Sequence, residues 1–153
     1  MAKINLQKDF LDFLELCNKH GVRYFIIGGY AVSFHGYPRA TKDIDIWVES
    51  KEENAKNLIL VIDDFGFKSL QLVKEDFLNS DGVTQLGVEP NRIDIILEME
   101  VVDFEMAWER RCVETIDEVE VNFIGLEDLL VLKKNAGRPQ DLADLSKLIK
   151  RKR

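Results

Sequence analysis

The 153-residue sequence contains little cysteine, little proline and no long hydrophobic run. Its two cysteines, Cys17 and Cys112, cannot form a disulfide framework, and we expect both to stay reduced. No apolar run approaches the roughly 20 residues that a membrane span requires. The N-terminus, MAKINLQKDF, lacks the apolar stretch of a signal peptide. These absences predict a cytoplasmic protein that makes no membrane contact.

Basic residues are fewer than acidic residues, with 21 Lys and Arg against 28 Asp and Glu, and the formal net charge is −7. A protein that grips nucleic acid over a wide surface is usually basic, so any nucleic-acid contact here would be local. The content of 46% hydrophobic and 32% charged residues is that of an ordinary globular protein, which excludes disorder as the main state. No repeat, linker or low-complexity segment divides the chain. We therefore expect residues 1–153 to form a single domain, with a core at about 22–99 and a C-terminal helical part at about 125–150.

Hydrophobic periodicity predicts that helices and strands are interspersed along the chain. The expected helices cover residues 5–20 with Asn5 as the cap, 30–35, 52–65, 104–111, 126–136 and 140–150. The expected strands cover residues 23–27, 43–49, 83–88, 92–99, 112–116 and 119–124, and turn residues 89–91 make the third and fourth an antiparallel hairpin. Leu142, Leu145, Leu148 and Ile149 are predicted to form the apolar face of the last helix. This order predicts an α/β (α+β) fold, with a mixed β-sheet flanked by helices and two C-terminal helices.

Carboxylates follow an alternating pattern on two of the predicted strands. Asp43 and Asp45 are separated by one residue, so both side chains project from the same face of their strand. Neighbouring carboxylates repel each other unless a cation lies between them, and Mg²⁺ prefers oxygen ligands of this kind. Asp94, in RIDIILEM, has the same alternating surroundings. If the two strands are neighbours, three carboxylates converge and could hold two metal ions for a phosphoryl displacement. The alternative is a half-exposed sheet whose acids face the solvent.

Gly28 and Gly29 stand where a predicted strand passes into a predicted helix. Glycine lets the backbone approach a ligand closely, and the free N–H groups at a helix start attract phosphate. A tight turn that needs a positive φ is the alternative. The loop that follows carries Arg39, Thr41 and Lys42 beside the carboxylates. A nucleoside triphosphate needs this combination, although the spacing of a Walker loop or a dinucleotide fingerprint is absent.

The combination resembles the nucleotidyltransferase fold superfamily. That superfamily has Gly-Gly or Gly-Ser after a strand, an Asp-x-Asp one short helix later and a third acid on a separate strand. The string GGYAVSFHGYPRATKDIDI is especially similar to the branch that holds the AbiEii-type toxins. The string LEDLLVLKKNAGRPQDLADL resembles a later motif of that branch, with Lys133, Arg138 and Asp141 at the matching positions. The resemblance spans residues 22–148.

The resemblance implies a reaction that depends on Mg²⁺ or Mn²⁺. A nucleoside monophosphate would pass from a nucleoside triphosphate to an acceptor hydroxyl, with release of pyrophosphate. Asp43 and Asp45 would hold the metal, and Asp94 would complete the second metal site and help to deprotonate the hydroxyl. The acceptor, whether RNA, protein or a small molecule, stays open.

The resemblance also implies a nucleotide-binding role for several residues outside the acids. Gly28 and Gly29 would hold the β and γ phosphates, and Lys133 would neutralise triphosphate charge beside Asp141. For Lys133, the alternative is a salt bridge to Asp141 or Asp144 on the next helix. For the whole chain, the alternatives are a catalytically silent nucleotide-binding or antitoxin-like regulatory partner and a small antibiotic nucleotidyltransferase. A homodimer or a complex with a protein partner is compatible with each of these.

Overall fold

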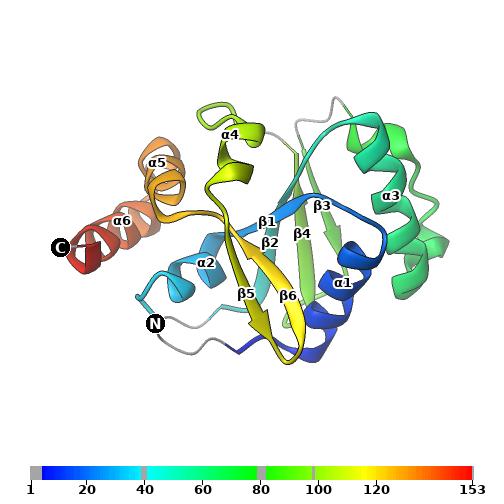
Figure 1. Ribbon diagram of the computed structural model, residues 1–153, viewed down its shortest axis with the longest axis horizontal. Coiled ribbons are helices and arrows are strands. Elements are labelled where there is room, and N and C mark those ends of the chain that lie inside the picture. The colour runs from blue at the N-terminus through cyan, green and yellow to red at the C-terminus, as the bar shows by residue number, and fades with distance from the viewer. Residues whose placement is uncertain (1–4, 39–40, 79–81, 98, 153) are drawn as a thin grey trace.

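A single mixed sheet organises the computed structural model, which describes residues 5–38, 41–78, 82–97 and 99–152. Within the described residues, six strands are arranged in the order β3-β4-β2-β1-β6-β5 (Figure 1). The strands are β1 (Tyr24–Ile27), β2 (Asp43–Val48), β3 (Val83–Leu86), β4 (Arg92–Ile96), β5 (Cys112–Ile116) and β6 (Val119–Phe123). β2 is antiparallel to β1 and parallel to β4, and β3 and β4 form the predicted hairpin. The mixed α/β fold is therefore confirmed.

Helices cover both faces of this sheet (Figure 1). They are α1 (Lys8–Lys19), α2 (Gly28–Phe34), α3 (Glu52–Ile62), α4 (Phe104–Glu109), α5 (Leu126–Ala136) and α6 (Pro139–Lys152). The short helical turns are η1 (Asp63–Phe67), η2 (Lys68–Leu70) and η3 (Lys74–Phe77). One apolar core lies between the sheet and α1 with α3, and a second lies between the sheet and α4, α5 and α6. None of the helices in the described ranges has the length and apolar character needed to cross a bilayer.

Strict alternation along the central strands gives each core its own set of side chains. On β1, Tyr24 and Ile26 belong to the α1–α3 core, whereas Phe25 and Ile27 belong to the other. On β2, Ile44 and Ile46 are buried on the α1–α3 side. Because side chains alternate across a strand, Asp43 and Asp45 must project from the opposite face. The strand pattern predicted from DIDI is thus confirmed.

Several details differ from the sequence-based prediction, among them a helix cap, a helix end and a helix face. Asn5 is wrong as the first cap, because helix α1 starts at Lys8 after an extended Gln7. Helix α3 ends at Ile62 and continues as the η1 turn, in which Gly66 has φ +105°. The predicted apolar face of α6 is also wrong in part, since Leu142 and Ile149 are 49% and 39% exposed.

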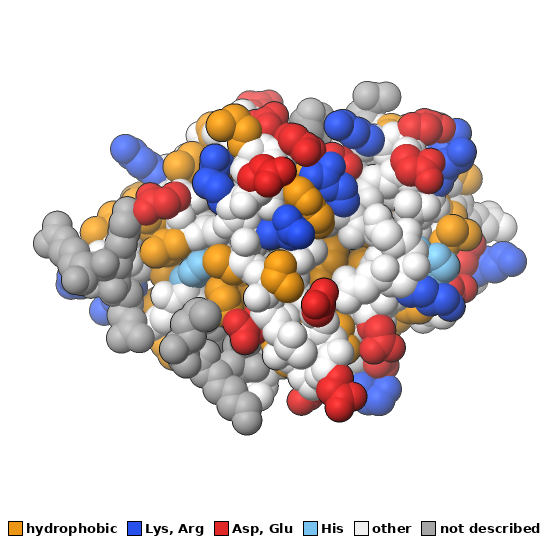
Figure 2. Space-filling view, in the orientation of Figure 1, with side chains coloured by type: hydrophobic (Ala, Val, Ile, Leu, Met, Phe, Trp, Pro, Cys, Tyr) orange, Lys and Arg blue, Asp and Glu red, His pale blue; other side chains and the backbone are white. Residues whose placement is uncertain are grey.

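Charged side chains cover the surface without segregation by sign on the face that Figure 2 shows, where Lys and Arg lie among Asp and Glu. The expectation that any contact with nucleic acid would be local, rather than spread over a broad surface, stays a prediction.

Candidate active site

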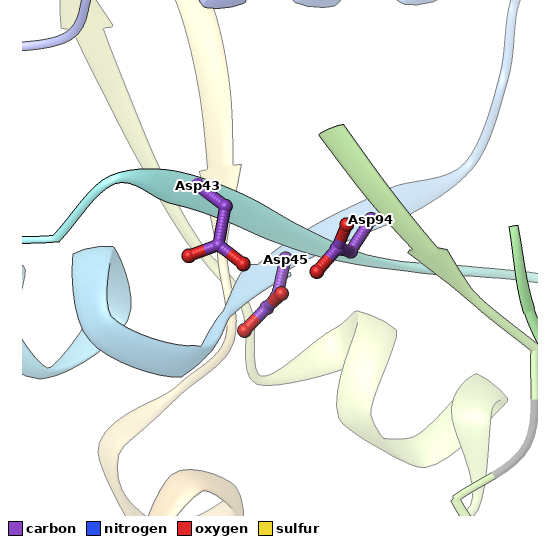
Figure 3. A group of neighbouring side chains, drawn as sticks. All are labelled: Asp43, Asp45 and Asp94. Carbon is purple, nitrogen blue, oxygen red and sulfur yellow. The ribbon is translucent and has the colours of Figure 1, made fainter. Parts of the chain in front are cut away.

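Three carboxylates converge at the centre of the sheet. Strands β2 and β4 are parallel neighbours, and their register sets Asp45 directly opposite Asp94. Carboxylate oxygens of Asp43, Asp45 and Asp94 lie within 4.8 Å of one another, and Figure 3 shows the three side chains approaching from the two strands. The structure therefore meets the condition on which the predicted acid cluster depended, namely that the two strands are neighbours.

The electrostatics of this cluster fit a divalent cation. Burial, together with the charges of Asp43 and Asp94, raises the pKa of Asp45 to about 7. Burial raises the pKa of Asp94 as well, although a hydrogen bond from Arg92 opposes it. Carboxylates that resist ionisation because they face one another are stabilised in their charged form by a cation between them. An all-oxygen donor set of this kind suits Mg²⁺ or Mn²⁺.

Gly28 makes room for one of these acids. Its backbone has φ +69°, and a Cβ at this position would overlap the carboxylate of Asp45. Both the left-handed conformation and the close approach therefore require glycine. Gly29 follows as a buried residue of α2, which has only seven residues.

A cavity of about 420 Å³ adjoins the carboxylates. Gly28 and Asp45 line it from the sheet side, and Lys133 with Arg138 and Asp141 line it from α5, α6 and their connection. The remaining lining residues are the apolar Ile27, Ile96, Met99, Val101, Leu129, Leu132 and Ala136 and the polar Glu100 and Asn135. A cavity that combines apolar walls with convergent polar and charged groups is typical of a small-molecule site.

Lys133 is buried in an ionic network between the last two helices. Its side chain is 8% exposed, and its Nζ lies 3.2 Å from Asp141 Oδ1 and 3.1 Å from Asp144 Oδ2. Arg138 Nε donates to Asp141 Oδ2 at 2.6 Å. Burial acts to raise the pKa of Asp141, but the hydrogen bonds from Arg138 and Lys133 outweigh it and hold this pKa below its usual value. Lys133 therefore makes the interhelical salt bridge of the alternative hypothesis and also lines the cavity beside Asp45.

The loop before β2 is only partly described. Thr41 Oγ1 donates to the backbone carbonyl of Asp43 at 3.1 Å, so Thr41 supports the start of the strand that carries the acids. Lys42 is exposed. Arg39, the third predicted phosphate contact of this loop, lies outside the described residues.

The patterns above did not select Arg92, yet the structure places it in the acid cluster. Arg92 is the strand partner of Asp43, and its Nη2 donates to Asp43 Oδ2 at 2.7 Å. Its Nε donates to Asp94 Oδ1 at 2.8 Å. The signal was present in RIDI, because the alternation that places Asp94 on this face also places the residue two positions earlier there.

Residues 5–151 match the family described as nucleotidyltransferase of unknown function (DUF6036). No protein with a curated description matches the sequence. The match to the family says nothing of the AbiEii-type branch, and the likeness to that branch stays a prediction.

Solved structures share the fold at low sequence identity. A Thermotoga maritima protein proposed to be a nucleotidyltransferase has a TM-score of 0.58 and 14% identity, over 92% of this chain and 90% of that one. The lincomycin-bound lincosamide antibiotic adenylyltransferase LnuA has a TM-score of 0.56 and 15% identity, over 95% and 98%. An antigenic nucleotidyltransferase-like protein from Paracoccidioides brasiliensis has a TM-score of 0.53 and 17% identity, over 94% and 77%.

These structural matches establish the fold, and the family match extends over nearly the whole chain. The sequence motifs, the mixed sheet and the family match agree with one another. The chain accordingly belongs to the nucleotidyltransferase family DUF6036 and has a nucleotidyltransferase fold.

Proposed function

We propose that this protein transfers a nucleoside monophosphate from a nucleoside triphosphate to an acceptor hydroxyl, in a reaction that requires Mg²⁺ or Mn²⁺. The observation that carries the proposal is the convergence of Asp43, Asp45 and Asp94 within 4.8 Å of one another. Asp45 also lines the cavity that holds the buried cation Lys133. A metal-binding carboxylate and a cationic wall in one cavity are suited to a metal-bound triphosphate.

The bound metal would supply Lewis-acid stabilisation of the charge that develops on the phosphate oxygens. Asp43 and Asp45 would hold the cation, and Asp94 would complete the second metal site and accept the proton of the acceptor hydroxyl. A bond forms between the acceptor oxygen and the α-phosphorus while the bond from that phosphorus to the β-phosphate oxygen breaks. Pyrophosphate leaves with the electrons of that bond.

The other predicted residues would bind the triphosphate. Gly28, with Gly29 behind it, lets the phosphates approach the backbone beside Asp45. Lys133 offers positive charge from the opposite side of the cavity, and Asp141 holds that ammonium in place at 3.2 Å. Thr41 and Lys42 would add contacts to the triphosphate, as would Arg39 of the same loop.

Calorimetry with a non-hydrolysable triphosphate analogue tests the binding step. We expect wild-type protein to bind the analogue far more tightly with Mn²⁺ than with EDTA. Asp45→Asn should lose this dependence on the metal, because it removes a ligand carboxylate. Asp12→Asn is the matched control, since Asp12 pairs with Lys8 on the exposed side of α1 and should behave like the wild type. Equal analogue affinity in wild type and Asp45→Asn would overturn the metal site.

Incubation with each labelled triphosphate, Mn²⁺ and a panel of acceptors tests the transfer step. The panel comprises RNA, the protein itself, a lincosamide and an aminoglycoside, and the readouts are pyrophosphate release and the position of the label. We expect release from wild type and Asp12→Asn, and none from Asp45→Asn. Metal-dependent binding without release would favour the catalytically silent nucleotide-binding alternative.

A further inference from the structure

Four charged residues form a compact array whose positions are fixed by strand pairing. Asp43 is the strand partner of Arg92, and Asp45 is the strand partner of Asp94. Asp43 and Asp45 share one face of β2, and Arg92 and Asp94 share the same face of β4. We call Asp43, Asp45, Arg92 and Asp94 the four-residue array. It contains three carboxylates and one guanidinium, so a cation is already built in beside the acids.

The guanidinium of Arg92 engages the oxygens that a metal ion would use. Its Nη2 donates to Asp43 Oδ2 at 2.7 Å and to Asp94 Oδ2 at 3.1 Å. Its Nε donates to Asp94 Oδ1 at 2.8 Å, so both oxygens of Asp94 are engaged. A planar guanidinium that donates to both oxygens of a carboxylate makes one of the stronger ion pairs in proteins.

Arg92 also has a weaker ion-pair partner outside the four-residue array. Arg92 Nη1 lies 3.5 Å from Glu89 Oε1, and the Glu89 side chain is 47% exposed. If Arg92 no longer donated to Asp43 and Asp94, an ion pair with this solvated carboxylate would restore only part of the lost interaction energy. Glu89 is therefore a poor substitute for Asp43 and Asp94 as a partner of Arg92.

We propose that Arg92 makes metal binding conditional on the triphosphate: it donates to Asp43 and Asp94 until a metal ion takes their oxygens, and it is transferred to the phosphate oxygens that arrive with the metal. This inference rests on the metal site of the proposed function. A metal ion by itself has to displace the guanidinium and leaves its N–H donors with Glu89. A metal–triphosphate complex brings oxygen acceptors whose geometry matches the guanidinium fork. The two ligands then favour each other's binding, and the coupling is reciprocal.

Calorimetric titration with Mn²⁺, with and without a non-hydrolysable triphosphate analogue, measures this coupling in wild type and Arg92→Gln. Without the analogue, we expect Arg92→Gln to bind Mn²⁺ at least about tenfold more tightly than wild type, because charged hydrogen bonds no longer have to be broken. The analogue should strengthen Mn²⁺ binding much less in Arg92→Gln than in wild type. Arg92→Lys, which keeps the charge but not the planar fork, should fall between the two.

Arg110→Gln is the matched control. Arg110 donates to both oxygens of buried Asp128, with Nε at 3.0 Å and Nη2 at 2.8 Å, so its loss removes the same kind of ion pair outside the array. This variant should retain the wild-type coupling between Mn²⁺ and the analogue. Circular dichroism and thermal unfolding of each variant establish that folded protein is being compared. If Arg92→Gln does not fold without metal, Arg92→Lys carries the comparison, and its affinity for Mn²⁺ alone should exceed that of wild type.

Two outcomes would contradict this inference, and they differ in what they mean for the proposed function. If wild type binds Mn²⁺ with the analogue, but the Arg92 variants bind Mn²⁺ alone no more tightly than wild type does, this inference is wrong and the proposed function stands. If neither wild type nor the variants bind Mn²⁺ even with the analogue, the metal site itself is wrong and both proposals fail.

Discussion

Gly28 shows at the scale of one residue how closely the backbone approaches the acid cluster. Its φ of +69° favours glycine, and the space that a Cβ would need is filled by the carboxylate of Asp45. The sequence pattern drew attention to Gly28 for phosphate binding, but its contact with Asp45 depends on the pairing of β1 with β2. That pairing brings together residues far apart in the chain, which local sequence cannot specify.

Gly28→Ala should therefore damage the site more than the fold. The left-handed backbone alone costs about 1–2 kcal/mol for a residue with a Cβ, and the overlap with Asp45 adds to this and displaces the carboxylate. Gly21→Ala is the control, because Gly21 has φ +71° and its nearest atom to a Cβ is 4.0 Å away. Urea unfolding should show the larger loss for Gly28→Ala, and Mn²⁺-dependent binding of a triphosphate analogue should fall only in this variant. If Gly28→Ala and Gly21→Ala lose the same stability and both bind the analogue normally, Gly28 serves only as a turn residue.

His35 gives a residue-scale prediction away from the acids. Its Nε2 lies 2.7 Å from the carbonyl oxygen of Ile124 and donates to it, which links the end of α2 to the segment after β6. Burial lowers the pKa of His35 from its usual 6.5, and this hydrogen bond only partly offsets the effect. The unfolded chain therefore takes up a proton before the folded protein does as the pH falls.

The contribution of His35 to the free energy of unfolding should accordingly decrease as the pH falls below 6.5, the usual pKa of the group, whereas Asp45, whose pKa is raised in the folded protein, contributes in the opposite direction. His35→Gln keeps an N–H donor but cannot titrate, so wild type should lose stability relative to this variant as the pH falls through that range. Urea denaturation at intervals between pH 7.5 and pH 5 measures both proteins. Parallel curves over the whole range would contradict the assignment.

At the scale of the element, α6 shows where hydrophobic periodicity misleads. Leu142 and Ile149 are exposed, whereas Asp141 and Asp144 are 2% and 0% exposed. The helix is rotated toward its acids because buried Lys133 on α5 needs charged partners. The sequence did predict that Lys133 would meet either a substrate or one of these aspartates. It could not predict that the ion pairs, together with Leu148 alone among the leucines of this helix, decide which face of α6 is buried.

Lys133→Met tests that network. Removal of one partner from a buried ion pair typically costs about 3–5 kcal/mol, and here it leaves Asp144 without the lysine at 3.1 Å. We expect urea unfolding to show a loss of this order. Asp144→Asn added to Lys133→Met should recover part of it, because a neutral amide then replaces the buried carboxylate that lost its lysine.

Lys134→Met is the control, since Lys134 is the exposed neighbour of Lys133 on α5 and should change stability little. Calorimetry on the folded proteins then separates the two roles of Lys133. Lower affinity for a triphosphate analogue in Lys133→Met would add a substrate role to the structural one. Unchanged affinity together with the stability loss would assign Lys133 to the fold alone.

At the scale of the whole molecule, the amino-acid sequence predicted the order of helices and strands along the chain well, but it predicted the order of strands in the sheet poorly. Alternation in DIDI and RIDI is a local property, and it correctly placed the acids on the face opposite the isoleucines. The order β3-β4-β2-β1-β6-β5 depends on which strands pair, and β2 meets β4 across 49 positions between Asp43 and Arg92. The meeting of three acids was therefore a conditional prediction, and the contact of Arg92 with Asp43 depends on the same strand pairing.

Binding at the cavity should stabilise the whole molecule, because its walls come from both the sheet and the α5–α6 pair. A ligand at a hundredfold excess over its dissociation constant stabilises the folded state by about 2.7 kcal/mol. For a chain of this size, that corresponds to a rise in melting temperature of about 5–10 °C. We expect this rise with Mn²⁺ and a triphosphate analogue together, and a clearly smaller one with Mn²⁺ alone, since the ion alone has to displace Arg92. Thermal unfolding in EDTA gives the baseline. The same rise in Asp45→Asn would mean that the stabilising ligand binds elsewhere, and the carboxylates would then have no part in it.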